Sequence, residues 1–264
     1  GVWRVAFDPD NSGKKFEWWK GSLPPTRDIR VPGALQQITE DGTYSGVAWY
    51  TRSFETPSPD GPSGRFLLRF WESYYVTEVW LNGKYIGSHE GGEDCFTFDV
   101  TRAVRESGGQ NSLVVRVVDV GGATPVDSFL SRQIPSCCGT GNGGLIDSVE
   151  LLVSPAVYLN DLHLLPDWKT GDIAVRVGMV NTLGKEISGR LVLSAKPAGG
   201  SNGMKSTAQA EFDVETVPDG ASVAERTIHV PGHRLWELYD PNLYSVTVRW
   251  IPKASEGESP RAGE

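Results

Sequence analysis

Residues 75–87 read Tyr-Val-Thr-Glu-Val-Trp-Leu-Asn-Gly-Lys-Tyr-Ile-Gly, so two runs of β-forming residues flank the pair Asn82-Gly83. Both residues of this pair tolerate the positive φ angles of a type I′ turn, and the stretch therefore predicts a tight β-hairpin. Just upstream, Phe66, Leu68 and Phe70 occupy alternate positions. Alternation with a period of two is the pattern of a strand with one buried face. Together these residues predict an antiparallel sheet that covers a core.

Further strands are predicted on both sides of this hairpin, at residues 2–7, 47–54, 95–100, 112–118 and 145–153. Two short helical turns are expected, at 34–39 and 101–106, and neither carries an apolar face long enough to pack as a major element. Eight or more strands with long connections are typical of a two-sheet sandwich of the jelly-roll type. We therefore predict such a domain over residues 1–154.

A second domain is predicted over residues 155–264, after the boundary at Ser154-Pro155. Six alternating segments follow that boundary, at residues 157–165, 172–179, 189–195, 208–214, 223–230 and 244–250. Their spacing is typical of an immunoglobulin-like sandwich, which has at least seven strands. The remaining tail, 252–264, is polar and rich in turn-forming residues. The predicted fold is therefore all-β, with a second sandwich that ends before its last strand.

Composition excludes several classes of function. The 264 residues carry 25 Lys and Arg against 33 Asp and Glu, a net charge of −8, which disfavours nucleic acid and anionic membrane surfaces as partners. No apolar run is long enough for a membrane span. Two β domains leave no room for a barrel of roughly 250 residues. The three cysteines form no disulfide framework. No signal peptide precedes the first strand, and we favour a periplasmic or secreted location over a cytoplasmic one.

Several motifs, taken together in their order and spacing, match one enzyme family. They lie at residues 31–33, 44–54, 79–92, 96–101, 143–151 and 235–244, so they extend over nearly the whole chain. The set resembles the N-terminal half of glycoside hydrolase family 2 enzymes, the group that includes β-galactosidases, β-glucuronidases and β-mannosidases.

The resemblance implies that the domains of the parent enzyme have different roles. In this family a jelly-roll sugar-binding domain and an immunoglobulin-like domain precede a (β/α)₈ barrel, and the barrel carries both catalytic carboxylates. The family's acid/base is the Glu of an Asn-Glu pair, and no Asn in this chain is followed by Glu. The chain is thus expected to be inactive by itself. The parent is expected to be a retaining β-glycosidase that resembles β-galactosidases. The two domains are expected to support its barrel and to form one wall of its sugar pocket.

The resemblance also points to one segment as the rim of the sugar pocket, residues 127–143. There Asp127, Arg132, Gln133 and Asn142 are candidates to hydrogen-bond sugar hydroxyls. Two residues differ from the family's pattern near this segment: Cys138 aligns where relatives have an Asp, and Asp147 aligns where they have an Arg. The alternative is a surface segment that only packs on the barrel.

Three tryptophans, Trp18, Trp19 and Trp71, are candidates to stack on a pyranose ring. The alternative for each is a place in a core or interface. The pairs Leu235-Trp236 and Leu243-Tyr244 are expected to fill the second sandwich or to contact a neighbouring domain.

No metal and no cofactor is predicted. Residues 8–13, Asp-Pro-Asp-Asn-Ser-Gly, begin like a calcium loop, but Trp19 stands where the closing Glu should be. A tight turn explains the same residues.

The expected partners are a β-glycoside, met through the parent enzyme, and the catalytic barrel of the same polypeptide, with oligomer contacts left open. An alternative function is a free-standing pair of carbohydrate-binding modules. A structural adhesion protein is a weaker alternative because it does not explain the motifs.

Overall fold

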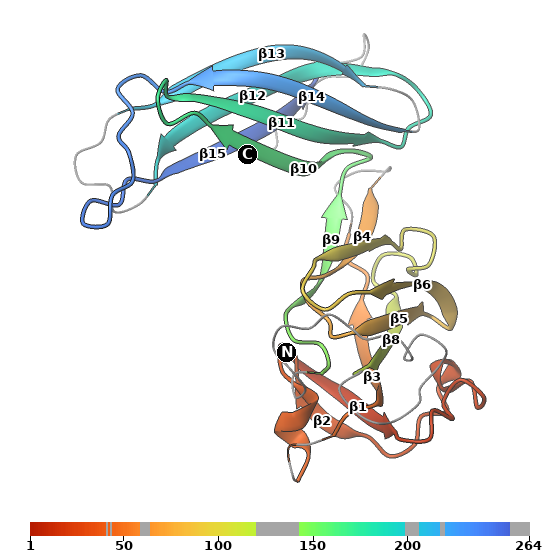
Figure 1. The fold of residues 1–264 in the computed structure, drawn as a ribbon. Helices are drawn as coiled ribbons and strands as arrows, with labels where there is room; N and C mark the ends of the chain where they lie inside the picture. The colour runs from red at the N-terminus through yellow and green to blue at the C-terminus, as the bar shows by residue number, and fades with distance from the viewer. Residues whose placement is uncertain are drawn as a thin grey trace. The chain divides into compact units, whose positions relative to one another are not determined.

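The computed structural model describes residues 1–40, 42, 44–58, 64–119, 143–198, 206–216 and 220–253. The chain forms two compact units, Gly1–Ser154 and Pro155–Glu264. Both units are built mainly from antiparallel strands, coloured red to green in the first and green to blue in the second (Figure 1). The predicted all-β architecture, a jelly roll followed by an immunoglobulin-like sandwich, is confirmed.

The described residues of the first unit form two sheets. Its strands are β1 (Val2–Asp8), β2 (Arg27–Arg30), β3 (Val47–Glu55), β4 (Arg65–Phe70), β5 (Val76–Leu81), β6 (Lys84–Glu90), β7 (Phe96–Asp99), β8 (Gln110–Val118) and β9 (Val149–Ser154). One sheet has the order β2-β1-β3-β8-β5-β6 and the other the order β7-β4-β9. Strands that are distant in the sequence lie side by side, such as β3 and β8. Long connections therefore join strands that are consecutive in the chain, as the sequence predicted.

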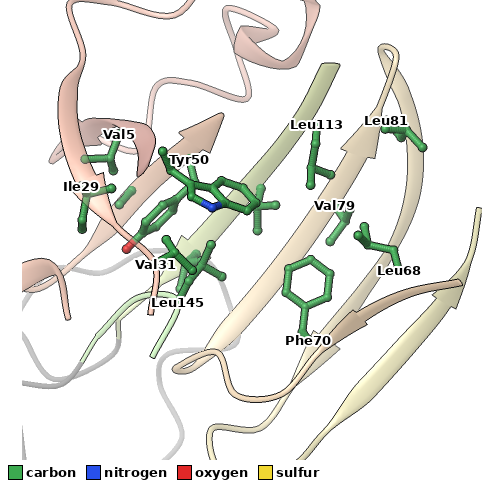
Figure 2. Close-up of a cluster of buried hydrophobic side chains, with 14 of the residues drawn as sticks. Val5, Ile29, Val31, Tyr50, Leu68, Phe70, Val79, Leu81, Leu113 and Leu145 are labelled. Carbon is green, nitrogen blue, oxygen red and sulfur yellow. The ribbon is translucent and has the colours of Figure 1, made fainter. Parts of the chain in front are cut away.

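The core of the first unit lies between these two sheets. Leu68 and Phe70 of β4 point toward Val79 and Leu113 of the larger sheet (Figure 2). These residues are buried, as is Phe66 on the same strand. The alternate positions predicted to form one buried face of β4 therefore do so, and their burial is the main stabilising contribution that this strand makes.

The Asn82-Gly83 hairpin joins β5 to β6. Asn82 has φ 52° and Gly83 has φ 78°, and Leu81 pairs directly with Lys84. Two consecutive positive φ angles between paired residues define a two-residue turn of type I′. The predicted turn is confirmed.

Of the two predicted helical turns, one forms a 3-10 helix and the other a single hydrogen-bonded turn. A 3-10 helix, η2 (Leu35–Ile38), lies inside the predicted range. Residues 101–106 form turns, with Ala103 N and Val104 N donating to Val100 O. A single turn fixes several dihedral angles for few hydrogen bonds and does not extend without a packed face. A short helix that was not predicted, η1 (Trp18–Lys20), precedes β2.

In the second unit the strands that the structure describes form a sandwich of two three-stranded sheets. Its strands are β10 (Val157–Pro166), β11 (Asp172–Asn181), β12 (Ile187–Pro197), β13 (Ala208–Thr216), β14 (Gly220–His229) and β15 (Tyr244–Pro252). The sheets have the orders β10-β11-β14 and β13-β12-β15. All six predicted strands are present. Their core includes Val175, Met179, Leu191 and Leu193.

Neither helical segment in the described part of the chain approaches the length needed to cross a membrane. The polar tail, residues 254–264, lies outside the described residues.

Candidate functional sites

The predicted sugar contacts lie on a segment that the structure does not describe. Asp127, Arg132, Gln133 and Asn142 all fall within residues 120–142, as does Cys138. Their roles therefore stay predictions. The structure does describe the residues on either side, which fix where this segment leaves the sandwich and where it returns.

The two flanking residues, Asp119 and Gly143, lie against each other. A Cβ atom on Gly143 would stand 2.2 Å from Asp119 Oδ2, so only glycine fits there. Asp119 is buried, and its Oδ2 accepts a hydrogen bond from Gln36 Nε2 over 3.0 Å. Leu35 N donates to Gly143 O over 2.9 Å. The segment thus starts and ends at one fixed place beside η2.

Two tyrosines lie close to this place. Burial raises the pKa of Tyr44 to about 12 and that of Tyr50 well above its usual value. In both cases the negative charge of Asp119 adds to the effect of burial. The two phenols therefore stay neutral at physiological pH and serve as packing groups rather than as bases, and the Tyr44 hydroxyl donates a hydrogen bond to Val47 O over 2.6 Å.

Four tryptophans pack on the outer face of the six-stranded sheet. Trp19 stacks on Trp80 with ring centroids 5.2 Å apart, and Trp18 meets Trp49 edge to face at 5.8 Å. Trp18, Trp49 and Trp80 are buried. Trp18 and Trp19, two of the candidates for sugar stacking, therefore have rings engaged in this cluster, which corresponds to the core alternative.

Trp71 is in a different environment. It is 43% exposed, and the Arg69 guanidinium lies 5.5 Å from its ring centroid. Next to it, partial burial and the charges of Asp147 and Glu93 raise the pKa of Glu72. Of the three candidate tryptophans, Trp71 alone keeps a substantially exposed ring.

The calcium-like motif is a turn closed by its own carboxylate. Asp8 Oδ1 accepts from Ser12 N over 2.7 Å, and Asp8 Oδ2 accepts from Gly13 N over 2.9 Å. These donors use both carboxylate oxygens. Within the described residues no group of three or more His, Cys, Asp or Glu side chains could hold a metal ion.

A group of exposed apolar side chains lies at one end of the second unit. The side chains of Trp168, Leu235, Trp236, Leu238, Tyr239 and Leu243, which we call the end patch, are all exposed, up to 95% for Tyr239. Most belong to the connection from β14 to β15, drawn in blue (Figure 1). Leu235, Trp236 and Leu243 do not fill the sandwich, because the core closes without them, so of the two alternatives the contact with a neighbouring domain stays a prediction. Tyr244 does pack against the core.

A cavity of about 290 Å³ lies within the end patch, and its lining is mainly apolar. The charged and amide side chains that line it have partners in the same unit. His233 Nε2 is 2.9 Å from Trp168 O, and the Arg234 guanidinium is 2.5 Å from Asp240. Asn242 Nδ2 donates to Leu235 O over 3.0 Å. A sugar needs polar groups that converge on its hydroxyls, whereas this cavity fits an apolar side chain.

Trp168 and Tyr239 were missed by the sequence analysis. Trp168 lies in the turn between β10 and β11, and it meets the other patch residues only because the fold brings that turn beside the β14–β15 connection. A cluster of aromatic and Leu residues between Gly232 and Tyr244 was the available signal.

Comparison with known protein families identifies the family of each of these two units. Residues 1–128 match the family model described as the sugar-binding domain of glycosyl hydrolases family 2, and residues 157–259 match a second model of the same family. The chain belongs to glycoside hydrolase family 2. It holds the sugar-binding and immunoglobulin-like domains of that family, and the catalytic barrel is not among its 264 residues.

Similar proteins carry β-glycosidase names. A β-glucuronidase of Rattus norvegicus is 27% identical over 208 residues, and a β-galactosidase of Thermoanaerobacter pseudethanolicus is 26% identical over 216 residues. These matches cover 69% and 79% of this chain. The solved β-glucuronidase of Ruminococcus gnavus matches 94% of the chain with a TM-score of 0.67 at 23% identity, a likeness that shows the shared fold.

The chain is much shorter than these relatives. It spans 31% of the rat protein, 26% of the Thermoanaerobacter protein and 40% of the Ruminococcus structure. In those proteins the two domains accompany the further residues of a glycosidase. Homology to the N-terminal domains of β-glucuronidases and β-galactosidases is therefore established for this chain, and activity is not.

Proposed function

We propose that this chain is the non-catalytic N-terminal part of a retaining β-glycosidase, whose two sandwiches support a catalytic barrel and form one wall of its sugar pocket. The chain alone has no glycosidase activity. The parent acts on a terminal β-glycoside, with β-galactoside and β-glucuronide as the two substrate classes that the named relatives favour.

The observation that carries this proposal is the end patch. Aromatic side chains bury about 150–250 Å² each when they are covered, so the three exposed rings of the patch alone offer roughly 400 Å². The leucines bring the total to or above the largest patch found on a typical monomer, about 300–600 Å². With its lining polar groups already engaged, the patch suits an apolar protein surface, as a catalytic domain would provide.

The fixed ends of the segment 120–142 support its proposed role at the sugar pocket. Functional side chains are often carried by long connections on a rigid scaffold. The hydrogen bonds of Asp119 and Gly143 provide that scaffold. We place Asp127, Arg132, Gln133 and Asn142 on the wall of the pocket as contacts to sugar hydroxyls.

A pair of free-standing carbohydrate-binding modules is the second candidate function, and exposed Trp71 is the observation that favours it. A ring with one open face can stack on a pyranose. This alternative requires binding by the 264-residue chain itself, with Trp71 at the centre of the site.

Two measurements test the proposal against this alternative. Hydrolysis of nitrophenyl β-glucuronide and β-galactoside is measured for the chain alone and for the polypeptide encoded by its complete reading frame. We expect turnover from the second and none from the first. Turnover by the chain alone would refute its non-catalytic role.

Binding is measured by titrating glucuronate, galactose and mannose into the ¹⁵N-labelled chain. We expect no saturable shifts. Saturable shifts that centre on Trp71 and vanish in Trp71→Ala, but persist in the control Trp236→Ala, would establish the binding-module alternative instead.

A further inference from the structure

Two arginines of the first unit have no acidic partner. Arg4 of β1 and Arg30 of β2 are exposed, and neither side chain forms an ion pair with a carboxylate in the described part of the chain. By contrast, Arg65 and Arg190 each pair with a carboxylate. The whole chain has a net charge of −8, so two neighbouring arginines without partners are a local excess of positive charge.

The sheet places these two arginines on one face. Strands β2 and β1 lie side by side at one edge of the six-stranded sheet (Figure 1). Arg4 pairs directly with Asp28, and Arg30 follows Asp28 by two positions. The two arginines are therefore diagonal neighbours on the same face, with backbones about 7–8 Å apart. This face is the outer one, because the alternate residues Trp3 and Ile29 belong to the inner core.

The surface around the arginines is hollowed on both sides of Val2. One hollow, of about 410 Å³, is lined by residues that include Val2, Arg4 and the hydroxyl-bearing Thr51 and Ser53 of β3. The other, of about 360 Å³, is lined by residues that include Val2 and Arg30. Val2 is 57% exposed and provides an apolar floor between the two. A concave surface with a few polar groups around an apolar floor has the features of a small-molecule site.

The polar groups of the site define the chemistry of its ligand. A guanidinium group presents a planar fork of N–H donors that matches a carboxylate. The hydroxyls of Thr51 and Ser53 can donate to and accept from the hydroxyls of a sugar. One exposed ion pair contributes only about 0–1 kcal/mol, so a single acidic sugar, which meets one arginine at a time, is held too weakly to saturate the site. A ligand with two or more carboxylates meets both.

We propose that the hollows around Val2 form a docking site for an acidic oligosaccharide, a carbohydrate chain with carboxylates on several of its residues. Arg4 and Arg30 bind the carboxylates, and Thr51 and Ser53 bind hydroxyls. The site goes beyond the proposed function because it needs no catalytic barrel. It holds an acidic carbohydrate chain on a domain that itself has no catalytic role.

One carboxylate within the site opposes such a ligand. Asp28 lies directly opposite Arg4 and lines the same hollow as Arg30. No ion pair joins it to either arginine. Its charge therefore repels an anionic ligand without neutralising the guanidinium groups by direct contact. Removal of this charge should strengthen the binding of an acidic chain and leave the binding of a neutral one unchanged.

A titration of the ¹⁵N-labelled 264-residue chain with tetragalacturonate tests the proposal. At about 0.01 M salt we expect saturable shifts of the amides around Val2, Arg4, Arg30 and Ser53, and a weaker affinity at about 0.15 M salt, where exposed charges are screened. Cellotetraose, a neutral chain of the same length, and monomeric galacturonate are the ligand controls. Neither should give saturable shifts.

Substitutions at exposed positions assign the site, because they leave the core intact. Arg4→Ala and Arg30→Ala should each lower the affinity for tetragalacturonate by about three- to tenfold, since each removes one of the two carboxylate contacts. Asp28→Asn should raise it by about twofold or more. Arg102→Ala is the matched control, because Arg102 is also exposed and without an ion pair but follows β7. It should leave the affinity unchanged.

The proposal is overturned if tetragalacturonate gives no saturable shifts at low salt, if cellotetraose binds as well, or if Arg102→Ala weakens binding as much as Arg4→Ala and Arg30→Ala. Shifts that centre on Trp71 would overturn it too and would support the binding-module alternative. None of these measurements involves turnover. A failure of the docking site therefore leaves the proposed function intact, and a failure of the proposed function leaves the docking site to its own test.

Discussion

The indole Nε1 of Trp49 donates a hydrogen bond to Asp8 Oδ2 over 2.9 Å, and both residues are buried. The same carboxylate accepts hydrogen bonds from the backbone amides of Ser12 and Gly13. One side chain thus closes the turn after β1 and fixes it to β3, beneath the tryptophan cluster. A motif that begins like a metal site is, in this fold, a structural anchor.

Replacing this carboxylate should destabilise the first unit. Asp8→Ala leaves two buried donors, Gly13 N and Trp49 Nε1, without an acceptor. Each such loss costs about 1–3 kcal/mol, so we expect a decrease of about 2–6 kcal/mol in the free energy of unfolding. Calorimetry of the first unit's transition measures it. Asp10→Ala, an exposed position in the same turn, is the control and should change stability by less than about 0.5 kcal/mol. Equal effects of the two variants, or a calcium-dependent rise in the transition of the parent, would contradict the anchor role.

Two substitutions in the hairpin turn separate the contribution of backbone conformation to stability from that of side-chain hydrogen bonds. Asn82 Nδ2 donates to Ala103 O and to Asn111 Oδ1, each over 2.8 Å, and Asn82 Oδ1 accepts from Ser112 N over 3.0 Å. Asn82→Gly keeps the positive φ but loses these bonds, and should cost about 1–3 kcal/mol. Gly83→Ala keeps the bonds and strains φ, and should cost about 1 kcal/mol. Denaturant titration compares them, and a larger loss for Gly83→Ala would show that conformation dominates.

Gly144 and Tyr50 should be energetically coupled. Gly144 has φ 117°, and a Cβ atom there would stand 2.4 Å from the Tyr50 hydroxyl oxygen. Gly144→Ala should therefore cost about 2–4 kcal/mol through backbone strain and this clash. In Tyr50→Phe the clash is relieved, so the double variant should lose less than the sum of the two single variants. A double-mutant cycle measures the coupling, and strict additivity would place the whole cost in the backbone angle.

Glu72 should make the first unit less stable at neutral pH. Partial burial and the charges of Asp147 and Glu93 raise its pKa in the folded state. The folded state then binds the proton more tightly, so stability falls as pH rises from the unfolded pKa of about 4.3 through the raised pKa. Glu72→Gln should raise the melting temperature at pH 7 by roughly 1–2 °C. At about pH 3, where the carboxyl is protonated in both states, the gain should vanish.

The control for this prediction is Glu106→Gln, which removes one negative charge from an exposed position. It should leave the melting temperature nearly unchanged at both pH values. A gain in Glu72→Gln that persists at about pH 3 would assign the effect to packing instead of charge.

The strands were predictable because each signal is local. Alternation at Phe66, Leu68 and Phe70 needs only the neighbouring residues to indicate a buried face, and the Asn82-Gly83 pair specifies its own turn. Residues 101–106 show the limit of such signals. One turn of helix is decided by what packs on it, and the local sequence contains no information about that.

Solvent exposure depends on distant residues, which explains why the sequence left two alternatives open for several apolar side chains. Leu235 and Trp236 have the composition of core residues, but the second core closes without them. For Trp18 and Trp19 the sequence allowed either a stacking role or a place in a core, and their rings pack against Trp49 and Trp80 from other strands. In each case the deciding partner is tens of residues away in the sequence.

The all-β class, most of the strands and the family could be inferred from the residues alone, because alternation, turn chemistry and motif spacing are properties of contiguous residues. Which apolar side chains remain uncovered became clear only in the folded chain. Leu162 and Val177 are both inward-facing aliphatic residues on adjacent strands, but only Val177 has a sheet above it. Burial depends on what lies across the sandwich, and pairing across sheets is not encoded in either strand alone.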